Sequence, residues 1–142
     1  PKKHEVLGHL EGCKVFHFAG HGLVNPVDPT QSGLLLDDEN ITVEDFLDIN
    51  IKSGAPFLCV LSACLTGASD ESLLEDEGLN LISSCQFVGF RRTIGTLWQV
   101  SDSVCVEVAE GFYAELGQGG MTGNAVCRGL HRTLVSLRNE WV

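Results

Sequence analysis

The sequence predicts an α/β fold in which helices pack against a mostly parallel β-sheet. Residues 57–62 (FLCVLS) form a near-continuous apolar run, which is typical of a strand buried on both faces of a parallel sheet. A second β-rich segment, residues 13–19 (CKVFHFA), is closed by a Gly-His-Gly turn signal. Helical patterns separate the strand segments, and this alternation favours layered α/β packing. A chain of 142 residues fits a single domain over 1–142 with its own core.

The strands are expected at residues 13–19, 57–62 and 92–98. The last of these is less regular because Gly95 lies inside it. Three strands are few for an open sheet, which usually has about four to six. Because helix and sheet also begin abruptly, the domain is expected to be truncated at both ends, as a fragment of a longer chain.

Helices are expected at residues 4–10, from 42 onward, at 78–87, at 103–116 and at 126–137. Apolar residues recur in these segments at steps of three or four, which places them on one helix face. Thr42 is a candidate N-cap, followed by acidic residues in the first turn. The residues at 101–103 (SDS) are cap candidates for the next helix, so Asp102 has a structural explanation as an N-cap.

Charge and cysteine content restrict the class of protein. The formal net charge of −10 disfavours nucleic acid and anionic lipid and suits a cationic substrate or partner. No apolar run approaches a membrane span, and the N-terminal residues do not resemble a signal peptide. The six cysteines are scattered and form no C-x-x-C pair. They are expected to be free thiols in a reducing compartment, which indicates a cytoplasmic protein.

His21 and Cys64 are the strongest candidates for chemistry. Each is expected just beyond a strand, and ligands of open α/β sheets bind at the carboxyl ends of strands. An imidazole beside a thiol holds the thiolate near neutral pH. Gly20 and Gly22 are expected to let the chain turn sharply, and the backbone amides of Gly22 and Cys64 are candidate oxyanion donors.

Other interpretations of these residues are weaker. Cys13, His17 and His21 recur at steps of four, but no fourth ligand is apparent and His21 is expected beyond the strand, so we expect no metal and no cofactor. The remaining thiols are expected to be core residues: Cys59 in mid-strand, and Cys85, Cys105 and Cys127 as small buried hydrophobes of helices. The acidic segment 68–77, which follows Cys64, is typical of a solvated loop, with a regulatory role as the alternative.

The motifs resemble those of CHAT domains, a family of caspase- and separase-related peptidases often found after TPR repeats. Residues 17–22 (HFAGHG) and 61–67 (LSACLTG) are similar to its two signature stretches. Residues 32–36 (SGLLL), 41–45 (ITVED) and 94–102 (IGTLWQVSD) are similar to its intervening and following motifs. The interval of 43 residues from His21 to Cys64 is also near the roughly 50 residues of caspases. Because Gly67 follows Cys64 by three residues rather than two, the chain is not a caspase proper.

The resemblance implies a caspase-like three-layer sandwich and a cysteine endopeptidase that acts on a protein or peptide substrate. It implies that Cys64 is the nucleophile and His21 the general base or ion-pair partner. By similarity to separases, Asp102, and more weakly Asp76, would receive a basic P1 side chain, so cleavage after Arg or Lys is the hypothesis. A sensor or TPR-type region of the same polypeptide is the implied partner. The alternative is a catalytically silent interaction or scaffold module with the same fold.

Overall fold

The computed structural model describes residues 1–49, 51, 54, 56–66, 81–96 and 100–140, with the backbone alone for residues 64–66 and 140. The chain divides into two compact units, Pro1–Gln99 and Val100–Val142. The first unit is an α/β unit that contains the sheet, and the second is a pair of helices. The predicted α/β class is therefore confirmed.

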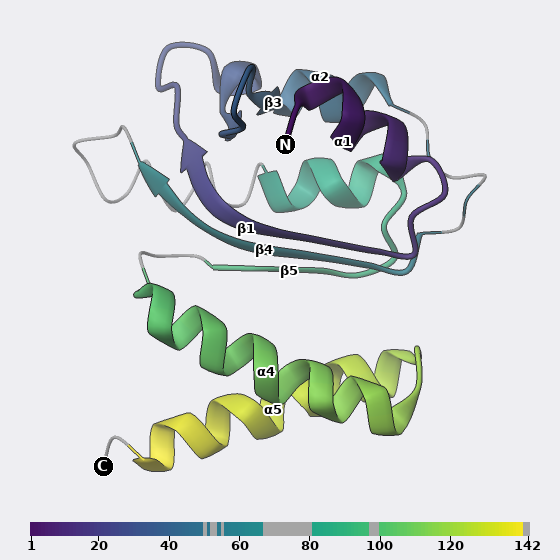
Figure 1. Cartoon of the computed structure of the whole chain (residues 1–142), viewed down its shortest axis with the longest axis vertical. Coiled ribbons are helices and arrows are strands. Elements are labelled where there is room, and N and C mark those ends of the chain that lie inside the picture. Colours follow the sequence, from purple (N-terminus) through teal and green to yellow (C-terminus); the bar gives the residue numbers. More distant parts are fainter. Residues whose placement is uncertain (50, 52–53, 55, 67–80, 97–99, 141–142) are drawn as a thin grey trace. The chain divides into compact units, whose positions relative to one another are not determined.

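Among the described residues, the sheet of the first unit has five strands in the order β3-β2-β1-β4-β5 (Figure 1). At its centre, β1 (Val15–Leu23) and β4 (Leu58–Thr66) run parallel along their whole length. β5 (Thr93–Gly95) extends the sheet in parallel beyond β4. On the other side, β2 (Gly33–Leu34) and β3 (Ile41–Thr42) are short antiparallel strands. The sheet is thus mixed.

The sequence prediction missed β2 and β3 because two residues are too few to produce a recognisable alternation. The expectation of parallel pairing holds for β1, β4 and β5 only. β1 begins two residues later than predicted and continues four residues further, and β4 also continues four residues beyond the apolar run. Of the third predicted strand, residues 97 and 98 lie outside the described residues.

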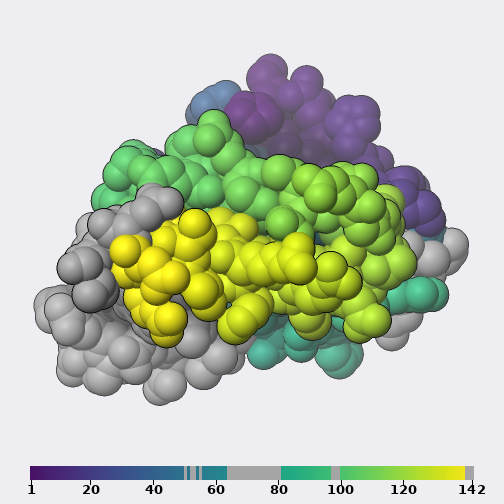
Figure 2. Space-filling model, turned by 90° about the horizontal axis from the view of Figure 1, so that it is seen from below, coloured from purple at the N-terminus to yellow at the C-terminus, as the bar shows by residue number. Residues whose placement is uncertain are grey.

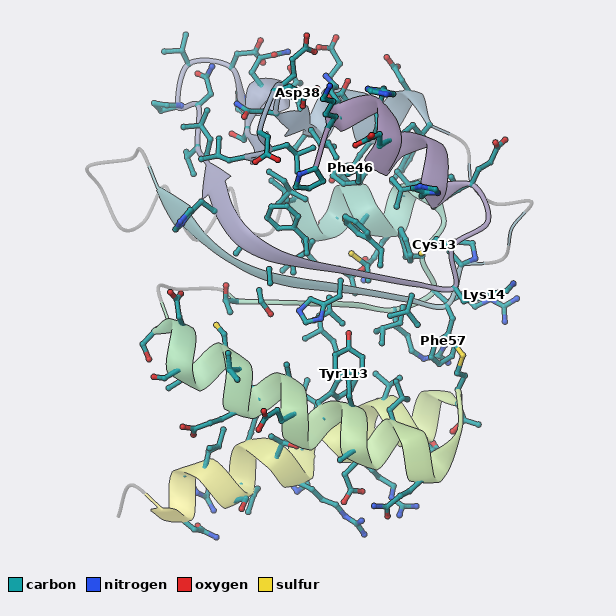
Figure 3. All side chains as sticks on the ribbon, viewed as in Figure 1. Cys13, Lys14, Asp38, Phe46, Phe57 and Tyr113 are labelled. Carbon is teal, nitrogen blue, oxygen red and sulfur yellow. The ribbon has the colours of Figure 1, made fainter. Side chains whose placement is uncertain are left out.

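One face of the sheet forms the core of the first unit. Phe18 of β1 and Cys59, Leu61 and Ala63 of β4 alternate toward this face and are buried there. It is covered by α1 (Lys3–Leu10), α2 (Val43–Asp48) and a helix over residues 81–88 (Figure 1). The shared core includes Leu10, Phe46, Leu81, Cys85 and Val88. Figure 3 labels Phe46 in the space between α2 and the sheet.

The helix predictions are largely confirmed. The segment predicted at 4–10 is α1, and the cap predicted at Thr42 is present, since the Thr42 hydroxyl accepts a hydrogen bond from the Asp45 amide. The helix predicted at 78–87 is observed over residues 81–88, one residue further than predicted, and residues 78–80 lie outside the described part of the chain. No helix among the described residues has the length and apolar character needed to cross a bilayer.

The second unit consists of α4 (Asp102–Gly119) and α5 (Gly123–Glu140), both longer than predicted. They lie side by side in Figure 2, where α4 is green and α5 yellow. Close approach depends on small residues: a Cβ at Gly129 would lie 3.3 Å from the Phe112 carbonyl oxygen, and one at Gly111 would lie 2.7 Å from Thr133 Cγ2. Phe112 and Leu116 are buried in this unit.

Candidate functional site

His21 and Cys64 are paired in the register of the two central strands. The nine-residue parallel ladder between β1 and β4 matches His21 with Cys64 directly. Neighbouring strands lie about 4.8 Å apart, so the two backbones are as close as strand pairing allows. The prediction required only that the two strands be neighbours, and this requirement is met. The side chain of His21 is exposed, and that of Cys64 lies outside the described atoms.

The position of the pair differs from the prediction in one respect. Both residues were expected just beyond their strands, whereas each is the seventh residue of a nine-residue strand. Gly20 and Gly22 therefore lie in extended backbone and make no sharp turn; among the described glycines only Gly89 and Gly120 have positive φ. Gly20 has a packing role instead, since a Cβ there would lie 3.0 Å from Cζ of the Phe18 ring.

A second histidine, which the sequence analysis assigned no role, lies on the same strand. His17 Nε2 is 3.2 Å from Ser62 Oγ, so a hydrogen bond joins β1 to β4 between the residues four before His21 and two before Cys64. The His17 side chain is exposed, but the protein atoms around its ring partly desolvate it, and this desolvation lowers its pKa below the usual value. The sequence contained a signal for placing His17 near His21, because residues four apart in one strand share a face of the sheet.

Hydrogen bonds also fix the neighbours of the pair. The Thr96 hydroxyl donates to the Ala63 carbonyl over 3.2 Å, which ties the chain after β5 to the residue before Cys64. On the other side, the Leu35 amide donates to the His21 carbonyl over 2.9 Å. The backbone around both candidate residues is therefore held from two directions.

The loop that follows β1 is ordered by its own side chains. Asn25 Oδ1 accepts hydrogen bonds from the amides of Val27 and Asp28, and Asp28 caps a short 3₁₀ helix, Pro29–Gln31. The fully buried Ser32 hydroxyl accepts from the Asn25 amide over 2.9 Å. Side-chain to backbone hydrogen bonds of this kind, as in Asx turns, hold a loop in one conformation without pairing to a strand. The edge of the sheet beyond His21 thus has a fixed shape.

The other cysteines differ from one another in environment. Cys59 and Cys85 are buried, as predicted, and both a hydrogen bond with Cys85 and burial raise the pKa of the Cys59 thiol. Burial also raises the pKa of Cys13, whose thiol donates to the Val15 carbonyl over 2.8 Å. The prediction was wrong for Cys127, which is exposed, and holds only in part for Cys105, which is half-buried. A helical position alone does not fix which face a residue occupies.

The metal alternative gains no support within the part of the chain that the structure describes. No cluster of three potential ligands occurs among those residues. Cys13 lies before β1, and its thiol is already bonded to the backbone. The prediction that His21 lies beyond the strand is wrong, because β1 includes it, but no described residue completes a ligand set with it.

The structure describes only some of the residues predicted to bind substrate. Asp102 is exposed and is the first residue of α4. Ser101 occupies the N-cap position, so the alternative prediction that Asp102 is the N-cap is wrong. Asp102 belongs to the second unit, and its role as a pocket residue stays a prediction. Asp76 and the acidic segment 68–77 lie outside the described residues. Gly22 pairs with Leu34 and Leu65 in the ladder, and its oxyanion role likewise stays a prediction.

A family model described as CHAT domain matches residues 2–140, which span both compact units. No curated protein matches the chain.

Proposed function

Because the chain belongs to the CHAT domain family, we propose that it is a cysteine endopeptidase of the caspase- and separase-like type. Cys64 is the nucleophile and His21 is the base or ion-pair partner. The observation that carries the proposal is the register pairing of His21 with Cys64 across two parallel strands. Paired residues of neighbouring strands share a face of a sheet, so the pairing suits a thiol–imidazole site.

The reaction that we propose is acyl transfer. The imidazole of His21 takes the thiol proton and maintains the Cys64 thiolate, which attacks the substrate carbonyl carbon. Backbone amides, with Gly22 and Cys64 as the candidates, stabilise the oxyanion. The protonated imidazole then gives its proton to the leaving amine, and water hydrolyses the thioester to release the acid and the free thiol. None of these steps requires a cofactor.

We propose a basic P1 residue for the substrate. The formal charge of −10 favours a cationic peptide, and Asp102 offers an exposed carboxylate at the start of α4. Asp76 is the weaker candidate for the same role. The family association with TPR repeats motivates a sensor or TPR-type region of the same polypeptide as the partner that controls activity. Scattered cysteines without C-x-x-C spacing support a reducing, cytoplasmic location.

Cleavage of fluorogenic peptides that differ only at P1 tests the proposal. We expect cleavage after Arg and Lys, and loss of cleavage to background in Cys64→Ala. His21→Ala should lower kcat/KM by about 10²–10⁴-fold, since that is the usual contribution of a general base. Cys127→Ala is the matched control, because it removes an exposed thiol elsewhere and should leave the rate unchanged.

Two results would count against the proposal in different ways. Preference for an acidic or apolar P1 residue would remove the basic-substrate part and leave the peptidase assignment. No cleavage of any peptide, or cleavage that survives Cys64→Ala, would contradict the peptidase assignment. It would favour a catalytically silent module of the same family.

A further inference from the structure

Three residues form a row at the amino ends of the parallel strands, away from the end of the sheet that carries His21 and Cys64. Lys14, Phe57 and Arg92 directly precede β1, β4 and β5, which are neighbours in the sheet. Figure 3 labels Lys14 and Phe57 at this end, far from the arrowheads of the strands. Neighbouring strands lie about 4.8 Å apart, so the residues of this amino-end row are adjacent across the sheet.

Hydrogen bonds to the backbone hold the amino-end row in place. The Phe57 amide donates to the Lys14 carbonyl over 2.9 Å. The Cys59 amide donates to the Arg92 carbonyl over 2.8 Å, which ties β4 to the residue before β5. The Lys14 ammonium group donates to the Gly54 carbonyl over 2.7 Å. The three segments are therefore fixed relative to one another before any partner binds.

Stacking positions the guanidinium group of Arg92. Its Cζ lies 4.7 Å from the centre of the Phe57 ring. Contact with a ring occupies one flat side of a guanidinium, whereas its N–H donors lie in the plane and stay available. Because less side-chain freedom is left to lose, an anion that binds these donors pays a smaller entropic cost.

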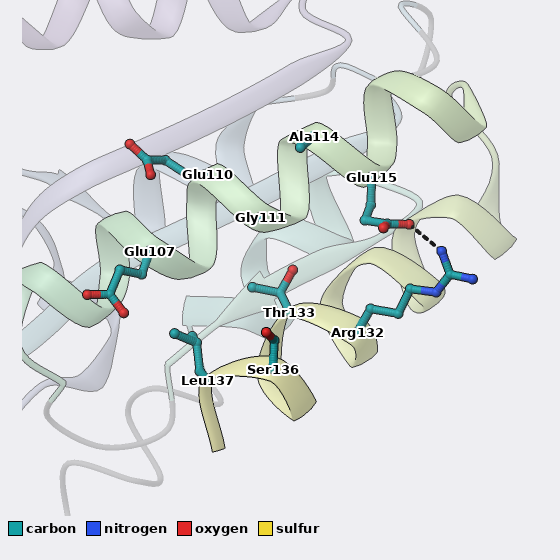
Figure 4. A pocket seen from close by; sticks show the side chains of 9 residues that line it. All are labelled: Glu107, Glu110, Gly111, Ala114, Glu115, Arg132, Thr133, Ser136 and Leu137. Atoms are coloured by element: carbon teal, nitrogen blue, oxygen red, sulfur yellow. Dashed lines mark hydrogen bonds and ion pairs between the residues drawn. The ribbon is translucent and has the colours of Figure 1, made fainter. Parts of the chain in front are cut away.

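Arg91 and Arg92 differ from an arginine that Figure 4 shows in the second unit. There, Arg132 Nη1 lies 2.9 Å from Glu115 Oε2. Neither Arg91, which is exposed, nor Arg92, which is half-buried, has an ion pair or a side-chain hydrogen bond within the described part of the chain. The described residues from 51 to 96 contain no Asp or Glu. Two guanidinium groups at this end of the sheet thus lack an acidic partner among the described residues.

We propose that the amino-end row, extended by Arg91, is a docking surface for an acidic segment of a separate partner protein. The in-plane N–H donors of Arg92 bind an Asp or Glu carboxylate of that segment through two parallel hydrogen bonds. Phe57 fixes the plane of the guanidinium. Lys14 and Arg91, both exposed, add positive charge beside the carboxylate.

A short acidic segment fits this surface better than a nucleic acid does. A nucleic acid carries a charge at every phosphate, and the net charge of −10 repels such a polymer beyond the few cationic residues. Lys14 also lies about 23 Å from His21 along β1, because each of seven residues rises about 3.3 Å. A partner that docks on the amino-end row therefore leaves the pair of His21 and Cys64 uncovered.

NMR titration of the full chain with a short glycine-serine peptide that contains four glutamates tests the proposal. The same peptide with glutamine in place of glutamate keeps the shape and removes the charge. We expect the glutamate peptide to shift the Nε–H signal of Arg92 and the amide signals of residues 14, 57 and 91–93. The glutamine peptide should leave these signals unchanged.

Matched variants separate a docking surface from general attraction between opposite charges. Arg91→Gln with Arg92→Gln should raise the Kd of the glutamate peptide about tenfold, since each exposed ion pair contributes modestly. Arg128→Gln with Arg138→Gln removes the same charge from exposed positions of α5 and should change the Kd less than twofold.

Variants of Phe57 test the positioning of the guanidinium apart from its charge. Phe57→Leu removes the ring that Arg92 stacks on and leaves every charge in place, so it should raise the Kd about threefold. Phe57→Tyr keeps an aromatic ring and should restore the wild-type Kd. Phe57 is half-buried and lies outside the core cluster, so we expect both variants to fold, as thermal unfolding followed by circular dichroism checks.

Equal weakening by the two arginine double variants would overturn the proposal, because the attraction would then be non-specific. An unchanged Kd in Phe57→Leu, or equal binding of the glutamine peptide, would overturn it as well. Tighter binding of a short single-stranded DNA than of the glutamate peptide would overturn the choice of a protein partner. These measurements are independent of peptidase activity.

Discussion

At the scale of single residues, three glycines differ in what surrounds them. A Cβ at Gly33 would lie 2.1 Å from the Ile41 carbonyl oxygen, so the close pairing of β2 with β3 excludes any side chain there. At Gly20 the nearest atom is the Phe18 ring, which can move. At Gly8, inside α1, nothing lies within 4 Å. The residue type is the same, and the space available decides the effect of substitution.

The three glycines predict how alanine substitutions change the free energy of unfolding, both in rank and in direction. Gly33→Ala should destabilise most, by more than about 3 kcal/mol, because backbone atoms must move. Gly20→Ala should cost about 1–3 kcal/mol, since the ring of Phe18 must shift. Gly8→Ala should stabilise by about 0.5–1 kcal/mol through helix propensity. Urea unfolding of the three variants checks the order; a neutral Gly33→Ala would contradict the close pairing of β2 with β3.

His17 gives a prediction about pH. Partial desolvation of its exposed side chain lowers its pKa in the folded chain, so the unfolded chain binds the proton more readily. Stability should therefore be highest above the unfolded pKa of about 6.5 and should fall as the pH drops toward the folded value. His17→Gln removes this group. We expect the free energy of unfolding to depend less on pH between 5 and 7 in the variant, as measured by urea titration; equal slopes would contradict the assignment.

At the scale of elements, α2 has a start that side-chain hydrogen bonds define. Thr42 and Asp45 form a capping box in which the Thr42 hydroxyl accepts from the Asp45 amide and Asp45 Oδ2 accepts from the Thr42 amide. Lys3 of α1 adds an ion pair to the same carboxylate at 2.8 Å. Burial alone would raise the pKa of Asp45, but Lys3 and Thr42 outweigh it and the pKa is lowered. One carboxylate thus caps α2 and ties it to α1.

Asp45→Asn should therefore destabilise by about 0.5–2 kcal/mol at pH 7, the usual range for loss of a cap. Since its folded pKa is lowered, the contribution of Asp45 is present above about pH 3.9 and is lost as the pH falls through the folded value. The wild type and the variant should converge in stability below that range. Asp48→Asn, at an exposed position of the same helix, is the control. Equal effects of the two substitutions at pH 7 would contradict the capping role.

Elements with a strong local signal were predictable from sequence, and the others were not. The helices α1, α4 and α5 have regular apolar spacing, and Thr42 has a recognisable capping pattern. β2 and β3 arise from tertiary pairing, in which Gly33 meets the backbone of Ile41, and two residues show no period. The continuation of β1 past Gly20 was missed because glycine ordinarily indicates a turn. Here Gly20 instead accommodates the Phe18 ring.

The candidate site was predictable in part for the same reasons. The motifs identified His21 and Cys64, and the register pairs them. The bond between His17 and Ser62 depends on strand register across 45 residues, which local patterns do not encode. The close approach of α4 and α5 at Gly111 and Gly129 was missed because helical spacing predicts the buried face of each helix but not how two helices meet.

At the scale of the whole molecule, thiol protection reports on the fold. Cys59 and Cys85 are buried in the core of the first unit, whereas Cys127 is exposed on α5. In pulsed alkylation followed by mass spectrometry, Cys127 should react within the pulse. Cys59 and Cys85 should react only at the rate of unfolding. Fast labelling of Cys59 in the native chain would contradict the core packing of β4.

The central claim, that His21 activates Cys64, is tested most directly by the alkylation rate of Cys64 as a function of pH. Mass spectrometry of the peptide containing Cys64 separates it from the other thiols. We predict a rate profile with a midpoint well below 8.5, the value of an ordinary cysteine, and a shift toward 8.5 in His21→Ala. A midpoint near 8.5 that is unchanged by the substitution would contradict the account.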